Sequence, residues 1–137
     1  MKYPATFSPE AAGITVTFRD IPEAITQGDD EADALFMAKD VLLASMEVYF
    51  DEKRTVPAPS AAQPGDHLIP LPASVAAKIL LLNQMLAQNV IPSELARRMD
   101  TTRQEVNRLI DLKHTTRIDR IEDAIAALGG ELELSVA

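Results

Sequence analysis

Residue types that read DNA bases occur together between Pro92 and Ile110, in the segment PSELARRMDTTRQEVNRLI. In the major groove, arginine pairs with guanine, whereas glutamine and asparagine pair with adenine. Side chains of these types stand at Arg103, Gln104, Asn107 and Arg108. Hydroxyl and cationic side chains suited to phosphate oxygens flank them, at Thr102, Lys113, Thr115, Thr116 and Arg117. The residue types and their spacing therefore predict a surface that contacts DNA.

A helix must carry these side chains, and the sequence supplies its start signal. TRQE is a capping box, in which Thr102 accepts from the Glu105 N–H and Glu105 reaches back. A shorter helix in PSELARRM precedes it, with Pro92 at its first position. The inward residues of the two helices are expected to be Leu95, Ala96, Met99, Val106, Leu109 and Ile110. Two short helices joined by a tight turn predict a helix-turn-helix; the alternative is a helical bundle with a solvated polar face.

Two further helices complete the expected all-α C-terminal half. The first is PASVAAKILLLNQMLAQN, whose apolar side comprises Val75, Ile79, Leu82 and Leu86. The last ends at Gly129 and Gly130, and its inward residues are Ile118, Ile121, Ile125 and Leu128. The final residues, GELELSVA, alternate as a β-strand does, with apolar Leu132, Leu134 and Val136. A strand needs a partner, which either a second subunit or the chain's own domain could supply.

The N-terminal half predicts a small α+β domain with the order ββαβ. YPATFS and ITVTFRD alternate in polarity around a turn at Gly13, as two antiparallel strands do. A helix follows in DDEADALFMAKDVLLASMEVYF, capped by Asp29 or Asp30. Its apolar stripe is Leu35, Leu42, Met46 and Tyr49, widened by Phe36, Leu43 and Phe50. HLIPLP, residues 67–72, adds a strand whose prolines place it at a sheet edge.

The charge is distributed unevenly between the two halves. Residues 1–72 hold five cations against twelve acids, a net charge of −7 out of −8 for the whole chain. Between Arg97 and Arg120 the balance reverses, with seven cations against four acids. The segment TVPAPSAAQPGDH divides the two regimes and has the composition of a linker or a long surface loop. We therefore expect one domain in residues 1–54 plus a strand at 67–72, a linker at 55–66 and a second domain in residues 73–137.

The composition argues against several classes of site. The chain has no cysteine, which excludes a disulfide framework and a thiolate metal site and fits a reducing cytosol. His67 and His114 lack the neighbours of a zinc or catalytic motif and are interpreted as surface residues. The carboxylates cluster at helix ends, and the longest apolar run is far shorter than the roughly 20 residues of a membrane span. We expect a cytoplasmic protein that is not an enzyme, with no cofactor, metal or small-molecule substrate.

Two resemblances follow from these motifs. ELARRMDTTRQEVNRLI resembles the helix-turn-helix of Cro/CI-type repressors, with Asp100 at a turn position that usually holds glycine and Pro92 where glutamine is common. The whole chain resembles the HicB antitoxins of HicAB toxin-antitoxin modules. That resemblance combines YPATFSPEAAGITVTFRDIPEAITQGDDEADAL, LPASVAAKILLLNQMLAQ and the helix-turn-helix, in this order and at this length.

The HicB resemblance implies a degenerate RNase H-like N-terminal domain that binds HicA, a small basic mRNA-cleaving toxin, and covers its active site. It also implies a C-terminal domain that binds double-stranded promoter DNA of its own operon as a dimer. A basic toxin would be attracted to the acidic domain, so we expect contacts at Asp20, Glu23, Asp29, Asp30 and Glu31. The terminal strand with Leu132, Leu134 and Val136 is the expected dimer interface, and such dimers could pair into tetramers.

Two alternative functions compete with the antitoxin hypothesis. One is a helix-turn-helix regulator whose N-terminal domain senses a small ligand and has no toxin partner. The other is an RNase H-like nuclease, which is disfavoured because no convergent set of strand-borne carboxylates is evident. A neighbouring gene for a small basic protein would favour the antitoxin hypothesis over the ligand-sensing one.

Overall fold

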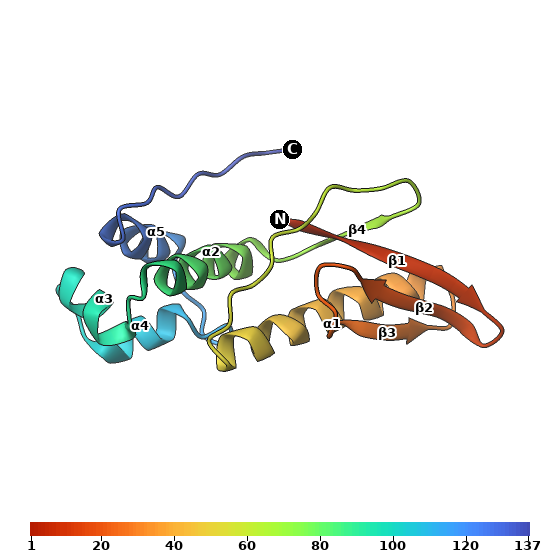
Figure 1. Cartoon of the computed structure of the whole chain (residues 1–137), viewed down its shortest axis with the longest axis horizontal. Coiled ribbons are helices and arrows are strands. Elements are labelled where there is room, and N and C mark those ends of the chain that lie inside the picture. The colour runs from red at the N-terminus through yellow and green to blue at the C-terminus, as the bar shows by residue number, and fades with distance from the viewer. The chain divides into compact units, whose positions relative to one another are not determined.

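The computed structural model describes residues 1–137 and divides into two compact units (Figure 1). The first comprises Met1–Tyr49 and Val56–Pro72, and the second comprises Phe50–Thr55 and Ala73–Ala137. The first unit is α+β. The second unit contains the end of the long helix that begins in the first unit, followed by four further helices. None of the helices combines the length and the apolar character needed to cross a membrane.

The first unit is built on a four-stranded antiparallel sheet with the order β3-β2-β1-β4. Its elements are β1 (Lys2–Glu10), β2 (Gly13–Phe18), β3 (Ile25–Gly28), α1 (Glu31–Asp51) and β4 (His67–Pro70). The β1–β2 hairpin turns at Ala11 and Ala12, and Gly13 follows as the first residue of β2 with a φ of 140°, which favours glycine. β4 forms one edge of the sheet beside β1, as its prolines predict.

The order ββαβ expected for this unit is wrong by one strand. β3 pairs with β2 in the register Thr17↔Ile25 to Ile14↔Gly28, so the order is βββαβ. The strand was missed because ITQG is only four residues long and contains a single large apolar residue. That residue, Ile25, is exposed, so β3 shows no alternation between apolar and polar positions.

The core of the first unit lies between the sheet and α1. The sheet contributes Tyr3, Ala5, Val16, Phe18 and Ile69, which are all buried. The buried face of α1 recurs at helical spacing and comprises Ala34, Ala38, Leu42, Ser45, Met46 and Tyr49. Small residues at the start of this face let the helix approach the sheet closely. A Cβ atom at Gly28 would collide with the backbone of Ala34.

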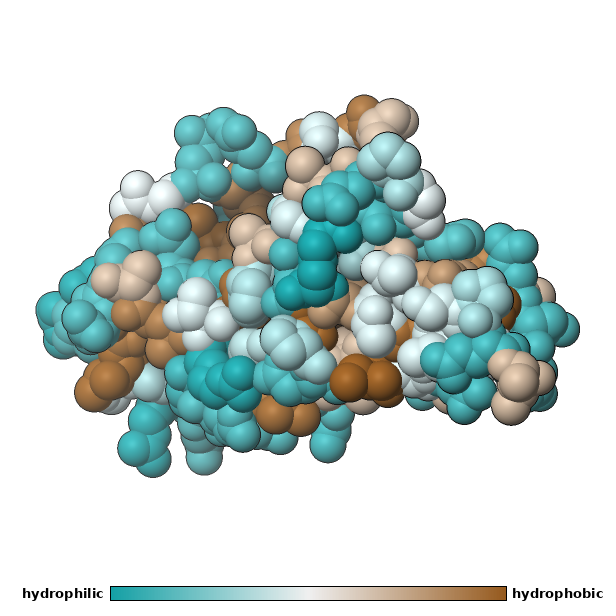
Figure 2. All heavy atoms as spheres, turned by 45° about the vertical axis from the view of Figure 1, so that its right-hand side comes forward, coloured by the Kyte–Doolittle hydropathy of each residue, from teal (hydrophilic) through white to brown (hydrophobic).

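The apolar stripe expected on α1 is therefore only partly correct. Leu42, Met46, Tyr49 and Phe50 are buried, but Leu35 and Leu43 are half-buried. Phe36 is 68% exposed, because Ala34 and Ala38 occupy the inward positions on that part of the helix. Figure 2 shows that apolar residues on the visible face form small groups separated by hydrophilic ones.

The Pro- and Ala-rich segment before β4 is held on the first unit by side-chain hydrogen bonds. The hydroxyl of buried Tyr3 donates to the Pro57 carbonyl at 2.6 Å. Arg19 pairs with Asp66 at 2.8 Å and donates to the Ala61 carbonyl. The segment is thus a surface loop with fixed anchor points, although it contains no helix or strand between Thr55 and Asp66.

The second unit packs α2 (Ala73–Gln88), α3 (Pro92–Arg98), α4 (Arg103–Leu109) and α5 (Ile118–Ala127) around one core. The expected inward residues Val75, Ile79 and Leu82 are buried, while Leu86 is half-buried. α2 is buried on more sides than a single stripe, and its other buried residues are Ala77, Lys78, Leu81 and Met85. In α5 the expectation fails at Ile118, which is 38% exposed because it lies in the first turn at the edge of the core.

The terminal β-strand expected in GELELSVA, residues 130–137, does not form in the single chain. No strand is assigned to these residues, and Leu134 and Val136 are 74% exposed and fully exposed, respectively. The physical reason is that no neighbouring strand of the chain lies beside them to complete a ladder of hydrogen bonds. Pairing with the chain's own domain, one of the two alternatives, is not observed.

Candidate nucleic-acid interface

The turn between α3 and α4 has the geometry of a helix-turn-helix. α3 ends at Arg98 and α4 begins at Arg103, which leaves four connecting residues. Asp100 adopts a left-handed conformation with φ of 54°, which aspartate tolerates better than most residues. The Thr101 N–H donates to the Ala96 carbonyl at 2.9 Å and closes the turn. The departure from glycine at position 100 therefore does not prevent the turn.

Thr102 caps α4, as the sequence predicts. Its hydroxyl oxygen accepts from the Glu105 N–H at 3.2 Å. The reciprocal half of the capping box is wrong, because the Glu105 carboxylate instead pairs with Arg108 at 3.1 Å. Val106 and Leu109 are buried on the inner side of the helix.

The four side chains predicted to contact bases share the outward side of α4. Arg103, Gln104, Asn107 and Arg108 are all exposed. Their spacing of three and four residues places them next to one another on the helix surface. A helix of this width fits the major groove of B-DNA, so these side chains could reach base edges together.

The residues predicted to contact phosphates lie at the start of α4 and in the loop after it. Thr102, Lys113, Thr115 and Arg117 are exposed, whereas Thr116 is half-buried. The Thr116 hydroxyl lies 3.5 Å from the His114 carbonyl. The Lys113 N–H donates to the Asp111 carboxylate at 2.9 Å. The loop is therefore ordered by local hydrogen bonds and presents its cations to solvent.

Lys78 is a functional candidate that the sequence analysis missed. It lies on α2, it is 2% exposed, and its ammonium group donates to three backbone carbonyls. The acceptors are Arg108 at 3.1 Å, Asp111 at 2.7 Å and His114 at 2.6 Å. Burial lowers the pKa of Lys78, and the nearby Asp111 carboxylate opposes this shift. The available signal was a single cation within an otherwise uncharged, largely apolar helix of 16 residues.

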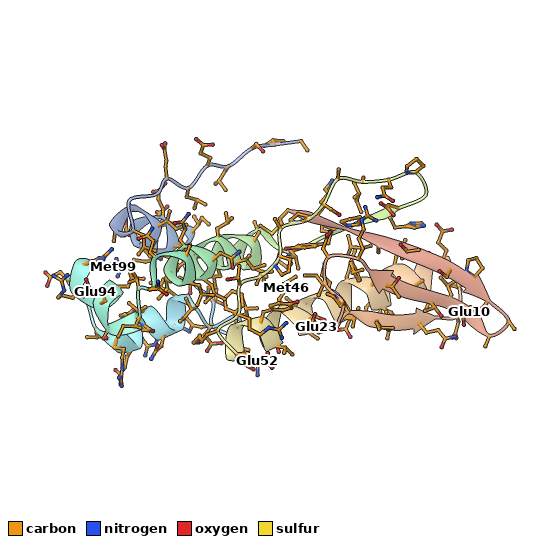
Figure 3. All side chains as sticks on the ribbon, viewed as in Figure 1. Glu10, Glu23, Met46, Glu52, Glu94 and Met99 are labelled. Atoms are coloured by element: carbon orange, nitrogen blue, oxygen red, sulfur yellow. The ribbon has the colours of Figure 1, made fainter.

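Two cations on α3, Arg97 and Arg98, belong to the positive stretch from Arg97 to Arg120 but have no individual DNA contact among the predictions. The Glu94 carboxylate pairs with Arg97 at 2.6 Å and with Arg98 at 3.1 Å (Figure 3 labels Glu94 on α3). Hydrogen bonds from these two guanidinium groups lower the pKa of Glu94 to about 2. Both arginines are exposed, so α3 presents two oriented cations whose charge is partly compensated.

The acidic residues predicted to contact a toxin fall into two groups. Three of them have partners within the first unit. Asp20 accepts from Ser60, Glu23 accepts from the Tyr49 hydroxyl at 2.8 Å, and Asp30 caps α1 through the Asp33 N–H. Asp29 and Glu31 are exposed beside the start of α1, and exposed Phe36 follows on the same helix. The predicted acids therefore do not form one free cluster.

The C-terminal tail, residues 130–137, was expected to mediate dimerisation, and its first residues border a cavity in the second unit. This cavity of about 380 Å³ is lined by α2 residues including Leu80 and Gln84, by Ile125 and by the start of the tail at Gly130–Glu133. Leu132 is half-buried there, whereas the later apolar residues project into solvent.

The two histidines have structural surroundings. The His67 ring stacks on Phe7 with ring centroids 3.9 Å apart, and the His114 carbonyl is an acceptor for Lys78. No three His, Asp or Glu side chains gather where they could hold a metal ion.

Comparison with known proteins gives a consistent set of relatives. Residues 2–80 match a family model described as the HicB_like antitoxin of a bacterial toxin-antitoxin system. The chain is 46% identical over 135 residues to Antitoxin HicB of Escherichia coli (strain K12), which covers 98% of each chain. It is 46% identical over 134 residues to Antitoxin HicB 2 of Photorhabdus laumondii, covering 98% of this chain and 95% of that one. It is 36% identical over 128 residues to Antitoxin HicB of Pseudomonas fluorescens, covering 93% and 88%, respectively.

Proposed function

This chain belongs to the HicB family of antitoxins, and we propose that it combines two binding activities. Its α+β domain, residues 1–54 with the strand at 67–72, binds a HicA-type mRNA-cleaving ribonuclease and neutralises it. Its helix-turn-helix domain, residues 73–137, binds promoter DNA of its own operon and represses transcription. In both activities the protein binds a partner rather than catalysing a reaction.

The exposed side of α4 carries the DNA-binding half of the proposal. Arg103, Gln104, Asn107 and Arg108 project from a capped helix that follows a closed turn, as a recognition helix requires. The cations of the following loop and of α3 surround this helix with positive charge, despite the net charge of −8 of the chain. Exposed charges act over about 8 Å at physiological salt, so local charge matters more than the total.

The charge of the first unit supports the toxin-binding half. This unit holds three cations and ten acids, a net charge of −7. A protein that binds RNA must present a positive surface, and complementary charge accelerates encounter with such a partner. Asp29, Asp30 and Glu31 lie together at the start of α1. Asp20 and Glu23 accept hydrogen bonds within the first unit, and their charges add to its negative electrostatic field.

Exposed Phe36 gives the proposed toxin interface an apolar anchor. Aromatic residues surrounded by polar ones often supply most of the binding energy at protein interfaces. Phe36 is large, exposed and one to two helical turns from Glu31. We therefore include Phe36 with the acids at the start of α1 in this interface.

Two finer features belong to the same proposal. We assign the first unit to a degenerate RNase H-like fold and the second to a Cro/CI-like fold, on the strength of the family resemblance. The terminal segment with Leu132, Leu134 and Val136 becomes a strand by pairing with the same segment of a second subunit. Such a dimer would hold two recognition helices about one DNA turn, roughly 34 Å, apart.

Co-expression with the small basic protein encoded beside the gene tests the toxin-binding half. We expect a complex that survives purification and in which RNA cleavage by the toxin stops. Free toxin that still cleaves RNA in the presence of excess antitoxin would contradict the proposal. In parallel, the purified chain should shift a fragment of its own promoter at salt concentrations where random DNA is unbound.

Matched charge reversals locate the toxin contact. Asp29→Lys combined with Glu31→Lys should weaken toxin binding and reduce its salt dependence. Glu10→Lys with Glu47→Lys reverses two acids at the end of β1 (Figure 3 labels Glu10) and in the last part of α1, and is the control in the same unit with the same change of charge. Equal weakening by both pairs would show that the net charge, rather than the start of α1, attracts the toxin.

A further inference from the structure

Lys78 is the one charged residue of the chain that is buried as a whole, with 2% of its surface exposed. A buried ammonium group is costly unless its donors are satisfied. The ammonium group has three N–H donors, and Lys78 directs them at three carbonyl oxygens, of Arg108, Asp111 and His114. The hydrogen-bonding capacity of the group is therefore filled by backbone alone.

The three acceptors lie in α4 and in the loop that follows it, and both of these are proposed to contact DNA. Arg108 lies in the last turn of α4, where carbonyls lack partners within the helix. Asp111 and His114 lie in the loop that leads to α5, where no helix or strand is assigned. One side chain from α2 thus joins the end of α4 to the eight-residue loop between α4 and α5.

The loop has few other anchors. Between Asp111 and Arg117 only Leu112 and Thr116 are less than exposed, and neither is fully buried. Its local hydrogen bonds, such as His114 N–H to the Asp111 carbonyl at 3.2 Å, order it internally without attaching it to the core. The contacts from Lys78 make that attachment.

We propose that Lys78 is a positioning residue for DNA binding, which holds the phosphate-contacting loop at a fixed place relative to the base-reading side of α4. The inference rests on the proposed DNA-binding function. Phosphate contacts set the register and orientation of a recognition helix in the groove. A loop that carries Lys113, Thr115 and Arg117 can do so only if its backbone is fixed relative to α4. The positive charge of Lys78 at the C-terminus of α4 also complements the helix dipole.

The test is Lys78→Met in the full chain, which keeps an unbranched side chain of similar length and removes the donors and the charge. We expect the variant to fold, with toxin binding unchanged because the first unit is untouched. Amide hydrogen exchange at residues 111–117 should rise at least about tenfold. Operator affinity should fall about 10- to 100-fold, and its salt dependence should become shallower as phosphate contacts are lost.

The controls separate positioning from general stability and from loss of charge. Lys2→Met makes the same substitution at an exposed site of β1 and should leave operator affinity unchanged. Lys78→Gln, which retains an NH₂ group, should give an intermediate affinity. A folded Lys78→Met protein with wild-type exchange at 111–117, or with wild-type operator affinity and salt dependence, would overturn the proposal.

A measurement on the wild type covers the case in which the variants do not fold. The ammonium signal of Lys78 should be visible by NMR and should couple across hydrogen bonds to the carbonyl carbons of Arg108, Asp111 and His114. A rapidly exchanging, uncoupled signal would overturn the proposal. A wild-type chain that did not bind its promoter would instead refute the DNA-binding function, and hydrogen exchange would then decide whether Lys78 holds the loop.

Discussion

In the second unit, individual residues fix the backbone and the charged groups at the two ends of α4, the proposed recognition helix. Thr102 satisfies the Glu105 N–H, Asp100 takes the left-handed turn, and Lys78 gathers three carbonyls after the helix. Each of these residues acts on the backbone, and none of them is one of the four side chains predicted to contact bases. The outward side chains are consequently free to contact a partner, apart from the ion pair between Glu105 and Arg108.

Truncation of the outward side chains should separate base readout from phosphate binding. Arg103→Ala, Gln104→Ala and Arg108→Ala should each cost about 1–3 kcal/mol of binding free energy on the operator, because a base contact is lost. Random DNA should be affected much less. Lys113→Ala is the matched control, which should weaken both DNAs similarly and reduce the salt slope by about 1. Equal weakening on both DNAs by the α4 variants would show that these side chains hold only phosphates.

Glu94 should make the stability of the second unit sensitive to acid. Because its folded-state pKa is lowered from 4.5 to about 2, its ion pairs stabilise the fold above about pH 4.5. This stabilisation should be lost as the pH falls through about 2. Urea midpoints measured from pH 7 to pH 2 should therefore decline more steeply for the wild type than for Glu94→Gln. Glu122→Gln, at an exposed position of α5, is the control and should follow the wild-type curve.

Elements differ in how much of their structure could be predicted from the sequence. The start of α4 was predictable because capping depends on two residues that are three positions apart. Thr102 does cap α4, by accepting from the Glu105 N–H. β3 was not, because four residues give no period and its one large side chain is exposed. Phe36 was wrongly predicted to be part of the inward stripe. Alanines occupy the inner face of that part of α1, although alanine is less hydrophobic than phenylalanine.

The candidate site shows the same division. The outward residues of α4 could be predicted because they remain once the buried positions of a short amphipathic helix are assigned. The role of Lys78 could not, because its three acceptors are 30 to 36 residues away along the chain. The split of the acidic residues also depends on distant partners, since Asp20 accepts from Ser60 and Glu23 from Tyr49.

The contact between β3 and α1 should make Gly28 intolerant of any side chain. A Cβ atom there would collide with the Ala34 backbone, which cannot move without displacing the helix. Gly28→Ala should therefore destabilise the first unit by about 3 kcal/mol. Gly65→Ala is the control, because Gly65 has a φ of 87° and open space around it. It should cost about 1–2 kcal/mol. Equal losses in denaturant unfolding would contradict the close approach of α1 to β3.

The whole molecule carries two charge regimes in two units. The first unit has a net charge of −7, and the second has ten cations against eleven acids, with its cations concentrated on α3, α4 and the loop to α5. One chain can therefore attract a basic protein and a polyanion without either surface cancelling the other. Because the two charge regimes are separate, a substitution in one unit should not change the affinity of the other unit for its partner.

Removal of the tail tests whether the whole molecule works as a dimer. A chain that ends at Gly130 lacks Leu132, Leu134 and Val136, which lie outside the core of the single chain. We expect the full chain to be a dimer at micromolar concentration by light scattering and the shortened chain to be a monomer of unchanged helix content. Operator affinity should fall by at least about 100-fold, because the second half-site is no longer bound by a linked partner.

The toxin complex supplies the control for this truncation. Toxin binding depends on the first unit in the proposal, so the shortened chain should still neutralise the toxin. Its affinity for a single half-site should match that of the full chain, since α4 and its loop are intact. A full chain that is already monomeric would rule out the tail strand as the dimer interface. A shortened chain that stays dimeric would place that interface elsewhere in the second unit, with the cavity between α2 and α5 as the next surface to vary.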